Sequence, residues 1–226
     1  MTSLKLYCAW FCPFAQRAWV ALLEKNVPFQ YIEHNPYKKK TAEFLALNPR
    51  GLVPVIVDNG QSIYESHICI EYVDEVGSPN VRLLPADPMK RAKVKLMCEY
   101  ISREIIPLWY GMLLKQGKDV QEGIKAMLLE NLKTLMTMKI TDGPYLMGQE
   151  FGMADIMLVP FTVRFPVLEF YRGFKIPSEE EFSVLREWIK ASHDRKHVKD
   201  TAPDKRRIIE VYKSYADGTA NVRSKF

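Results

Sequence analysis

The segment VPVIVDNGQSIYES, residues 53–66, restricts the fold of this chain more than any other. It contains two strand-like runs joined by Asn59-Gly60, the residue pair that type I′ hairpin turns prefer. Both central residues of that turn need a positive φ, which asparagine and glycine tolerate best. The segment therefore predicts a β-hairpin, so the first part of the chain must contain a sheet.

Strand and helix signals alternate around this hairpin. Period-two alternation predicts strands, and runs rich in Ala and Leu predict helices. Pro13 suits the first position of a helix, while Asn48-Pro49 and Gly77 each end one. The segments are LKLYCAW (4–10, strand), PFAQRAWVALLEK (13–25, helix), PFQYIEH (28–34, strand), TAEFLAL (41–47, helix), the hairpin, and SHICIEYVDEVG (66–77, helix). The predicted order over residues 1–77 is β-α-β-α-β-β-α.

The character of the sequence changes after a proline-rich stretch. Residues 78–87 lack hydrophobic periodicity, which indicates a linker. Asp87-Pro88 suits the N-cap and first position of a long helix, with a kink expected at Pro107. Further helical patterns, with no convincing strand among them, lie at 120–138, 152–165, 178–193 and 203–216. We expect an α/β plus all-α fold, with an all-helical domain over residues 88–226.

Composition narrows the classes of protein. The chain has 226 residues, 47% of them hydrophobic, and no run approaches the roughly 18 apolar residues of a membrane span. Its start, MTSLKLYC, lacks the regions of a secretory signal. The net charge of +5 comes largely from basic runs without a nucleic-acid-binding motif, so solvated surface charge is the favoured interpretation. We expect neither a nucleic-acid nor a membrane partner, and no ligand spacing predicts a metal.

Cysteine usage points to a reducing compartment. Four cysteines without a C-x-x-C pair do not form a disulfide framework, so a cytoplasmic location is expected. The C-terminal SKF is only a distant relative of the peroxisomal signal S-K-L, and no prediction rests on it.

Cys12 differs from the other cysteines in its position. If the strand–helix assignment holds, Cys12 is the N-cap of the first helix and Pro13 its first residue. Backbone N–H groups and the macrodipole at a helix N-terminus stabilise a thiolate, which is the nucleophilic form. The alternative is a structural cysteine that happens to precede a helix, and this is the favoured interpretation for Cys8, Cys69 and Cys98.

The position three residues after Cys12 is Ala15, which excludes a dithiol pair of thioredoxin type. A lone thiolate that attacks a disulfide forms a mixed disulfide, and an external thiol must release it. The sequence therefore predicts a monothiol cycle with a small soluble thiol such as glutathione.

Three further segments offer groups that bind a thiol peptide. A cis Val53–Pro54 bond would turn the Val53 backbone toward an extended peptide, although an ordinary edge proline is an equal alternative. Ser66 starts a helix and can bind a carboxylate, and Glu65 can take an ammonium group or simply serve helix electrostatics. Lys39 or Lys40 can neutralise a second carboxylate.

The motifs CPFAQR, NPRGLVPVI and IYESHICIEYVDE, in this order, resemble the cysteine-type glutathione transferases. The omega class is most similar, followed by the lambda class and the dehydroascorbate reductases. The resemblance implies a thioredoxin-like N-terminal domain that binds glutathione and an all-helical C-terminal domain. It also implies a glutathionylated Cys12 and a glutathione site formed by Phe14, Lys40, Val53, Pro54, Glu65 and Ser66.

The helical half departs from the family pattern at one place. Gly152 stands where a Ser or Thr N-cap is usual, three residues before Asp155, so a reduced capping box is expected. The acceptor pocket is assigned to aromatic residues, although such stripes more often belong to the core. The candidates are Trp10, Phe11, Trp109, Tyr110, Phe170, Tyr171 and Tyr212.

The resulting functional prediction is an omega-type thiol transferase that exchanges disulfides, removes glutathione from small or protein disulfides and reduces dehydroascorbate. Conjugation of electrophiles is expected to be weak, because a hydroxyl suits that role better than a cysteine. The alternatives are a non-catalytic ligand carrier and a protein like the chloride intracellular channels. The resemblance leaves a homodimer, usual for omega-type chains, and a monomer, usual for lambda-type chains, as open alternatives.

Overall fold

The computed structural model describes residues 4–38 and 40–220. The chain divides into two compact units, and each is described by itself. Unit 1 comprises the chain up to Ala86 together with Lys196–Ala202, and unit 2 comprises Asp87–Arg195 together with the residues from Pro203 onward. Lys39 and the C-terminal SKF, both considered above, lie outside the described residues.

A four-stranded sheet forms the centre of unit 1. Its strands are β1 (Lys5–Cys8), β2 (Gln30–Glu33), β3 (Val55–Asp58) and β4 (Gln61–Tyr64), in the spatial order β2-β1-β3-β4. β1 runs parallel to β2 and antiparallel to β3, and Asp58 pairs with Gln61 at the end of the β3–β4 hairpin. Asn59 and Gly60 have φ of 48° and 83°, so the predicted hairpin turn is confirmed.

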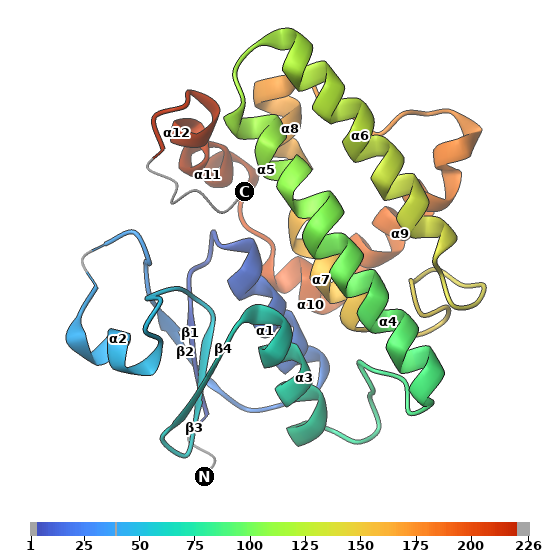
Figure 1. Cartoon of the computed structure of the whole chain (residues 1–226). Coiled ribbons are helices and arrows are strands. Elements are labelled where there is room, and N and C mark those ends of the chain that lie inside the picture. The colour runs from blue at the N-terminus through green and yellow to red at the C-terminus, as the bar shows by residue number, and fades with distance from the viewer. Residues whose placement is uncertain (1–3, 39, 221–226) are drawn as a thin grey trace. The chain divides into compact units, whose positions relative to one another are not determined.

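Helices cover both faces of this sheet, which gives the thioredoxin-like fold. α1 (Pro13–Glu24) and α3 (Ser66–Val76) lie on one face and α2 (Ala42–Leu47) lies on the other (Figure 1). Ala15, Ala18 and Val20 of α1 and Cys69 and Ile70 of α3 are among the fully buried residues of this core. The predicted order of strands and helices is therefore confirmed.

Unit 2 is all-helical in the part of the chain that the structure describes, with an isolated bridge between Tyr145 and Gly148. Its helices are α4 (Pro88–Tyr100), the π-helical η1 (Ile101–Ile105), α5 (Ile106–Leu114), α6 (Lys118–Thr137), α7 (Met153–Thr162), α8 (Phe165–Arg172), the 3₁₀ turn η2 (Glu180–Phe182), α9 (Ser183–Asp194), α11 (Lys205–Val211) and α12 (Lys213–Ala216).

The helix boundaries confirm some predictions and correct others. Asp87 caps α4 by accepting from the Lys90 N–H at 2.8 Å, and the π-helical turn η1 precedes Pro107. The helix predicted at about 152–165 is confirmed as α7, although it ends at Thr162. Helix α8, over Phe165–Arg172, was not predicted; Pro166 lies in its first turn, where the missing N–H costs no hydrogen bond within the helix.

The segment Lys196–Thr201 forms a helix, α10, that no pattern in the sequence predicts. It belongs to unit 1, where it packs against α1, although it lies within the range assigned to the helical domain. The domain division at residues 78–87 stays a prediction.

The reduced capping box at the start of α7 is confirmed. Gly152 is the N-cap and has no side chain, so only the Asp155 half of the box exists. Asp155 Oδ2 accepts from the Gly152 N–H at 2.9 Å, and Oδ1 accepts from the Leu146 N–H at 2.9 Å and from Trp188 Nε1 at 2.6 Å.

Candidate active site

Cys12 lies at the junction between β1 and α1. Its N–H donates to the Ala9 carbonyl at 2.9 Å, and its carbonyl accepts from the Gln16 N–H at 3.1 Å. With φ −82° and ψ 119° it is the N-cap of α1, and Pro13 occupies the first turn, as predicted. The half-buried Cys12 side chain is thus at the helix end where N–H groups and the macrodipole favour negative charge.

The other cysteines are buried, and none of the four forms a disulfide bond. Burial raises the pKa of the Cys8 thiol far above its usual range, and the nearby charge of Cys12 raises it further. Burial also raises the pKa of Cys69 to about 12. Cys98 is buried in α4, so the predicted packing role of all three is confirmed. Ala15 carries no thiol and is fully buried in α1.

The Val53–Pro54 peptide bond is cis, one of the two alternatives that the sequence left open. Both residues are buried, and they precede β3, whose ladder with β1 starts at Val55 opposite Tyr7. The Val53 backbone therefore lies outside that ladder. Phe14 is half-buried in the first turn of α1, and the Arg17 guanidinium carbon is 5.0 Å from its ring centre.

Glu65 is the N-cap residue of α3 and has a φ of 69°, which is rare for a residue with a long side chain. Residues held in this region concentrate at functional sites. The Glu65 carboxylate forms an ion pair with Arg50, through Oε1 and Nη1. The Glu65 carboxylate was predicted to bind an ammonium group of the ligand. In this structure it faces the Arg50 guanidinium group instead.

Ser66 begins α3, and its side chain is buried. Its hydroxyl oxygen accepts a hydrogen bond from Arg17 Nη1 at 3.0 Å, and Arg17 is itself only 2% exposed. A hydroxyl that accepts from a cation still has its own hydrogen to donate. Ser66 can therefore donate to an anion, as can the first backbone N–H groups of α3.

Lys40 lies against the turn that precedes Pro54. Its ammonium group donates to the Arg50 carbonyl at 2.8 Å. Gly51 has a φ of 62°, a left-handed conformation that glycine adopts without strain, and a Cβ at this position would displace the Lys40 side chain. Of the two predicted lysines, the structure thus describes Lys40, at the same turn as Arg50.

Two family models match most of the chain. The model for the glutathione S-transferase N-terminal domain matches residues 11–76, and that for the C-terminal domain matches residues 104–201. Glutathione S-transferase 3 of Glycine max is 33% identical over 210 residues, which cover 91% of this chain and 94% of that protein. The chain belongs to the glutathione S-transferase family.

Solved structures extend this similarity to both units of this glutathione S-transferase. Glutathione transferase Omega 3C from Trametes versicolor has a TM-score of 0.86 and 37% identity, covering 97% of this chain and 93% of its own. The Tau class MiGSTU from mango, Mangifera indica, has a TM-score of 0.84 and 27% identity, covering 95% of this chain and 99% of its own. These neighbours belong to two classes, Omega and Tau. They therefore support the family and do not decide between the two classes.

Apart from Lys40, which precedes α2 and contacts the Arg50 carbonyl, the predicted glutathione-site residues of this family member lie on three segments of unit 1: the start of α1, the turn at 48–54 and the start of α3. Two arginines that contact these residues were not predicted. Arg17 lies between Phe14 and Ser66, and its charge on the apolar face of α1 was an available signal. Arg50 pairs with Glu65 from 15 positions away, and no local pattern marks such a pair.

The aromatic residues predicted for the acceptor pocket of this transferase divide between the units. Trp10 belongs to unit 1, where its ring centre is 5.6 Å from that of Phe11. In unit 2, the ring centres of Tyr110 and Tyr212 lie 5.1 Å and 5.4 Å from that of Trp109. Trp109 is fully buried, and among the described residues its indole N–H has no hydrogen-bond acceptor.

The remaining aromatic candidates lie on α8. Phe170 is exposed, and the Tyr171 hydroxyl donates to the Ile209 carbonyl at 2.9 Å. The cluster around Trp109 belongs to the core of unit 2, and a part for these residues in an acceptor pocket stays a prediction.

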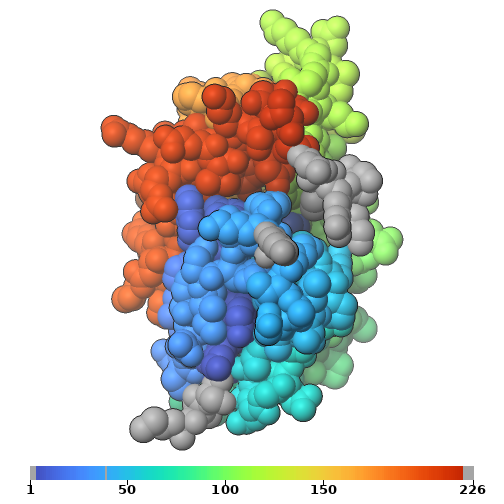
Figure 2. Space-filling model, turned by 90° about the vertical axis from the view of Figure 1, so that its left-hand side faces the viewer, coloured from blue at the N-terminus to red at the C-terminus, as the bar shows by residue number. Residues whose placement is uncertain are grey.

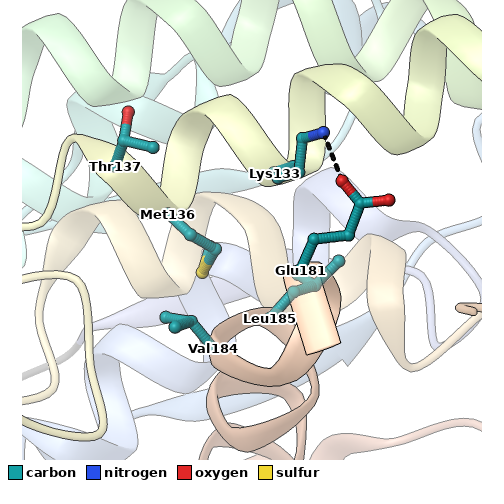
Figure 3. A pocket seen from close by; sticks show the side chains of 6 residues that line it. All are labelled: Lys133, Met136, Thr137, Glu181, Val184 and Leu185. Atoms are coloured by element: carbon teal, nitrogen blue, oxygen red, sulfur yellow. Dashed lines mark hydrogen bonds and ion pairs between the residues drawn. The ribbon is translucent and has the colours of Figure 1, made fainter. Parts of the chain in front are cut away.

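A shallow groove of about 230 Å³ opens in unit 2 between α6 and α9 (Figure 3). It is lined by Lys133, Met136, Thr137, Glu181, Val184 and Leu185, none of which was predicted as a site residue. Lys133 and Glu181 pair across it at 2.9 Å. Within residues 4–38 and 40–220, no helix has the length and apolar character of a membrane span, and no cluster of His, Cys, Asp or Glu suits a metal ion.

Proposed function

We propose that this glutathione S-transferase is an omega-type thiol transferase that works through a mixed disulfide on Cys12. The observation that carries the proposal is the position of Cys12 at the N-cap of α1, half-buried, while the other three thiols are buried. A helix N-terminus lowers the pKa of a thiol below the usual value of about 8.5, so we expect a substantial thiolate fraction at neutral pH.

Two exchange steps complete the cycle. The Cys12 thiolate attacks the glutathionyl sulfur of a mixed disulfide; a new S–S bond forms on Cys12, the old one breaks, and the substrate sulfur leaves as a thiolate. A second glutathione thiolate then attacks the Cys12 adduct and leaves as oxidised glutathione, which returns Cys12 to the thiolate. With Ala15 in the place of a second thiol, the external glutathione must perform this second step.

Glutathione binding is assigned to the groups around Cys12. The Val53 backbone pairs with the peptide beside Pro54, Phe14 lines the site, and Lys40 faces the glycine carboxylate. Glu65 and Ser66 hold the γ-glutamyl end. The buried Arg17 supports this role of Ser66, because it directs the hydroxyl hydrogen away from itself.

The wider assignments follow from this chemistry. Dehydroascorbate is a second substrate: a thiolate adds to one of its carbonyl carbons, and a second thiolate, from Cys12 or glutathione, then attacks the bound sulfur. A disulfide forms, the C–S bond breaks, and its electron pair reduces the substrate to ascorbate, while reduced glutathione regenerates the thiols. Of the predicted aromatic residues, half-buried Trp10, two residues before Cys12, is proposed to contact the acceptor, whereas Trp109, Tyr110 and Tyr212 are buried in unit 2. We place the protein in the cytoplasm, where glutathione and reduced thiols are maintained, and we propose a homodimer, as in omega-type chains.

Conjugation of glutathione to electrophiles is the second candidate function, since the Tau class structure is nearly as similar in fold as the Omega one. In conjugation the protein only stabilises a bound glutathione thiolate, and no adduct forms on Cys12. The two functions thus differ in one covalent intermediate.

Intact-mass spectrometry after exposure to oxidised glutathione tests the proposal. We expect one glutathione adduct, located on Cys12, removed by reduced glutathione and lost in Cys12→Ala but kept in Cys98→Ala. Thiol transfer should disappear in Cys12→Ala alone. Strong conjugating activity that survives in Cys12→Ala, together with little thiol transfer, would reverse the assignment.

A further inference from the structure

The Glu65–Arg50 pair places two opposite charges side by side at the proposed γ-glutamyl end of the glutathione site. The two side chains are 37% and 41% exposed, so a ligand can reach both. Exposed ion pairs are weak, because water and salt compete with them. A ligand that carries both charges can therefore replace each partner of this pair at little cost.

The backbone of Arg50 is held firmly, although its side chain reaches the surface. Asn48 is buried, accepts from the Arg50 N–H through Oδ1 at 3.0 Å and donates to the Leu52 carbonyl through Nδ2 at 2.9 Å. Lys40 fixes the Arg50 carbonyl at 2.8 Å. The turn thus presents the guanidinium from an ordered base. The chain segment of this turn follows α2 and belongs to the light-blue part of the chain (Figures 1 and 2).

The α-amino acid end of glutathione carries an ammonium group and a carboxylate on the same carbon atom. We infer that Arg50 binds this α-carboxylate by exchanging ion pairs, while Glu65 takes the ammonium group. The inference rests on the proposed binding of glutathione. It gives Arg50 a role in specificity, for thiol peptides whose first residue has both charges free.

The exchange keeps every charge paired. Before binding, Glu65 and Arg50 neutralise each other; after binding, each faces a ligand group of opposite sign. The guanidinium has five N–H donors in a fork that fits a carboxylate. Ser66, whose hydroxyl accepts from Arg17, donates to the same carboxylate of the ligand. A ligand with only the ammonium group leaves Arg50 without a partner, and a ligand with only the carboxylate leaves Glu65 without one.

Calorimetric titration of four proteins with three ligands tests the inference. The proteins are the wild type, Arg50→Leu, Arg50→Lys and the control Arg82→Leu, which removes an exposed arginine beyond the far end of α3. The ligands are glutathione, an analogue without the α-carboxylate (4-aminobutanoyl-Cys-Gly) and an analogue without the α-ammonium group (glutaryl-Cys-Gly). Thermal unfolding of each variant checks that the fold is retained.

We expect Arg50→Leu to weaken glutathione binding about fivefold or more, with Arg50→Lys in between and Arg82→Leu unchanged. The loss should persist with glutaryl-Cys-Gly and vanish with 4-aminobutanoyl-Cys-Gly. An unchanged or tighter affinity of Arg50→Leu for glutathione, or an equal loss with both analogues, would overturn the inference. If the wild type itself does not bind glutathione, the proposed function fails instead.

Discussion

Asp155 is a fully buried carboxylate in the helical unit that accepts three N–H groups. Burial raises its pKa from 3.8 to about 6, against the opposing effect of those hydrogen bonds. Because the folded pKa lies above the unfolded value, the folded state binds the proton more tightly. The contribution of this proton to stability is complete below about pH 3.8 and is lost as the pH rises through about 6.

Asp155→Asn removes this titration while keeping one oxygen that can accept from Leu146 and Trp188. We expect the unfolding free energy of the wild type, relative to the variant, to fall by about 2 to 3 kcal/mol between pH 4 and pH 7. Denaturant unfolding at intervals of pH measures it, with the exposed Asp142→Asn as control. A relative stability that rises with pH would contradict the assignment.

His193 titrates with the opposite sign. Its Nε2 is 2.9 Å from Thr162 Oγ1, and burial lowers its pKa from 6.5 to about 4. The unfolded state therefore binds more protons between these values, and stability falls as the pH drops from 6.5 toward 4. We expect the wild type to lose about 2 to 3 kcal/mol relative to His193→Gln over this range, measured by the same unfolding series.

The two groups oppose each other between pH 4 and pH 6, so the wild-type profile alone does not separate them. The variants do, because each removes one titration. Equal pH profiles for wild type and His193→Gln would show that the imidazole is not held neutral by the fold.

At the candidate site, the sequence predicts residues whose signal is local. Cys12 with Pro13, and Glu65 with Ser66, are recognisable because a helix end needs particular neighbours. Arg17 and Arg50 escaped prediction because their roles depend on partners 49 and 15 positions away. A charged residue on an apolar helix face indicates that it has a partner, but the sequence does not identify that partner.

The same distinction holds for whole elements. The β3–β4 hairpin was predictable because its turn fixes the pairing of neighbouring residues, and the N-cap of α4 because Asp87-Pro88 is sufficient for it. Helix α10 was not, since a short helix depends mainly on what it packs against. Its partner, α1, precedes it by more than 170 positions.

Helix α10 is tied to α1 by buried polar groups. Gln16 Nε2 donates to Thr201 Oγ1 at 3.1 Å, and both residues are buried. His197 Nδ1 lies 3.4 Å from the buried Glu24 carboxylate. Gln16 is also the residue whose N–H closes the first turn on Cys12, so α10 supports the start of α1.

Thr201→Val keeps the shape of the side chain but removes this acceptor from the Gln16 amide. We expect it to lower the unfolding free energy by about 1 to 2 kcal/mol, because a buried donor loses a partner. Thr201→Ser retains the hydroxyl and should be closer to the wild type in denaturant unfolding. Equal losses in the two variants would mean that the hydrogen bond to Gln16 carries no stability.

At the scale of the whole chain, the linker after unit 1 is held by a buried ion pair. Lys25 is buried and pairs with Asp74 at 2.9 Å, and its ammonium group also donates to the Val81 carbonyl. Asp74 accepts from the N–H groups of Leu83 at 2.8 Å and Leu84 at 3.1 Å. Residues 81–84 are therefore fastened to unit 1, rather than forming a loose tether.

Lys25→Met removes the ammonium group and leaves the Asp74 carboxylate 8% exposed without its cation. Breaking a buried pair on one side is costly, so we expect unfolding to become easier by about 3 kcal/mol. The linker should also be released, and limited proteolysis should cut faster between residues 78 and 87. Lys5→Met, on β1, removes a lysine from the same unit outside this pair and should change neither measurement. Unchanged cleavage in Lys25→Met, despite a loss of stability, would mean that Asp74 alone holds the linker through its two backbone hydrogen bonds.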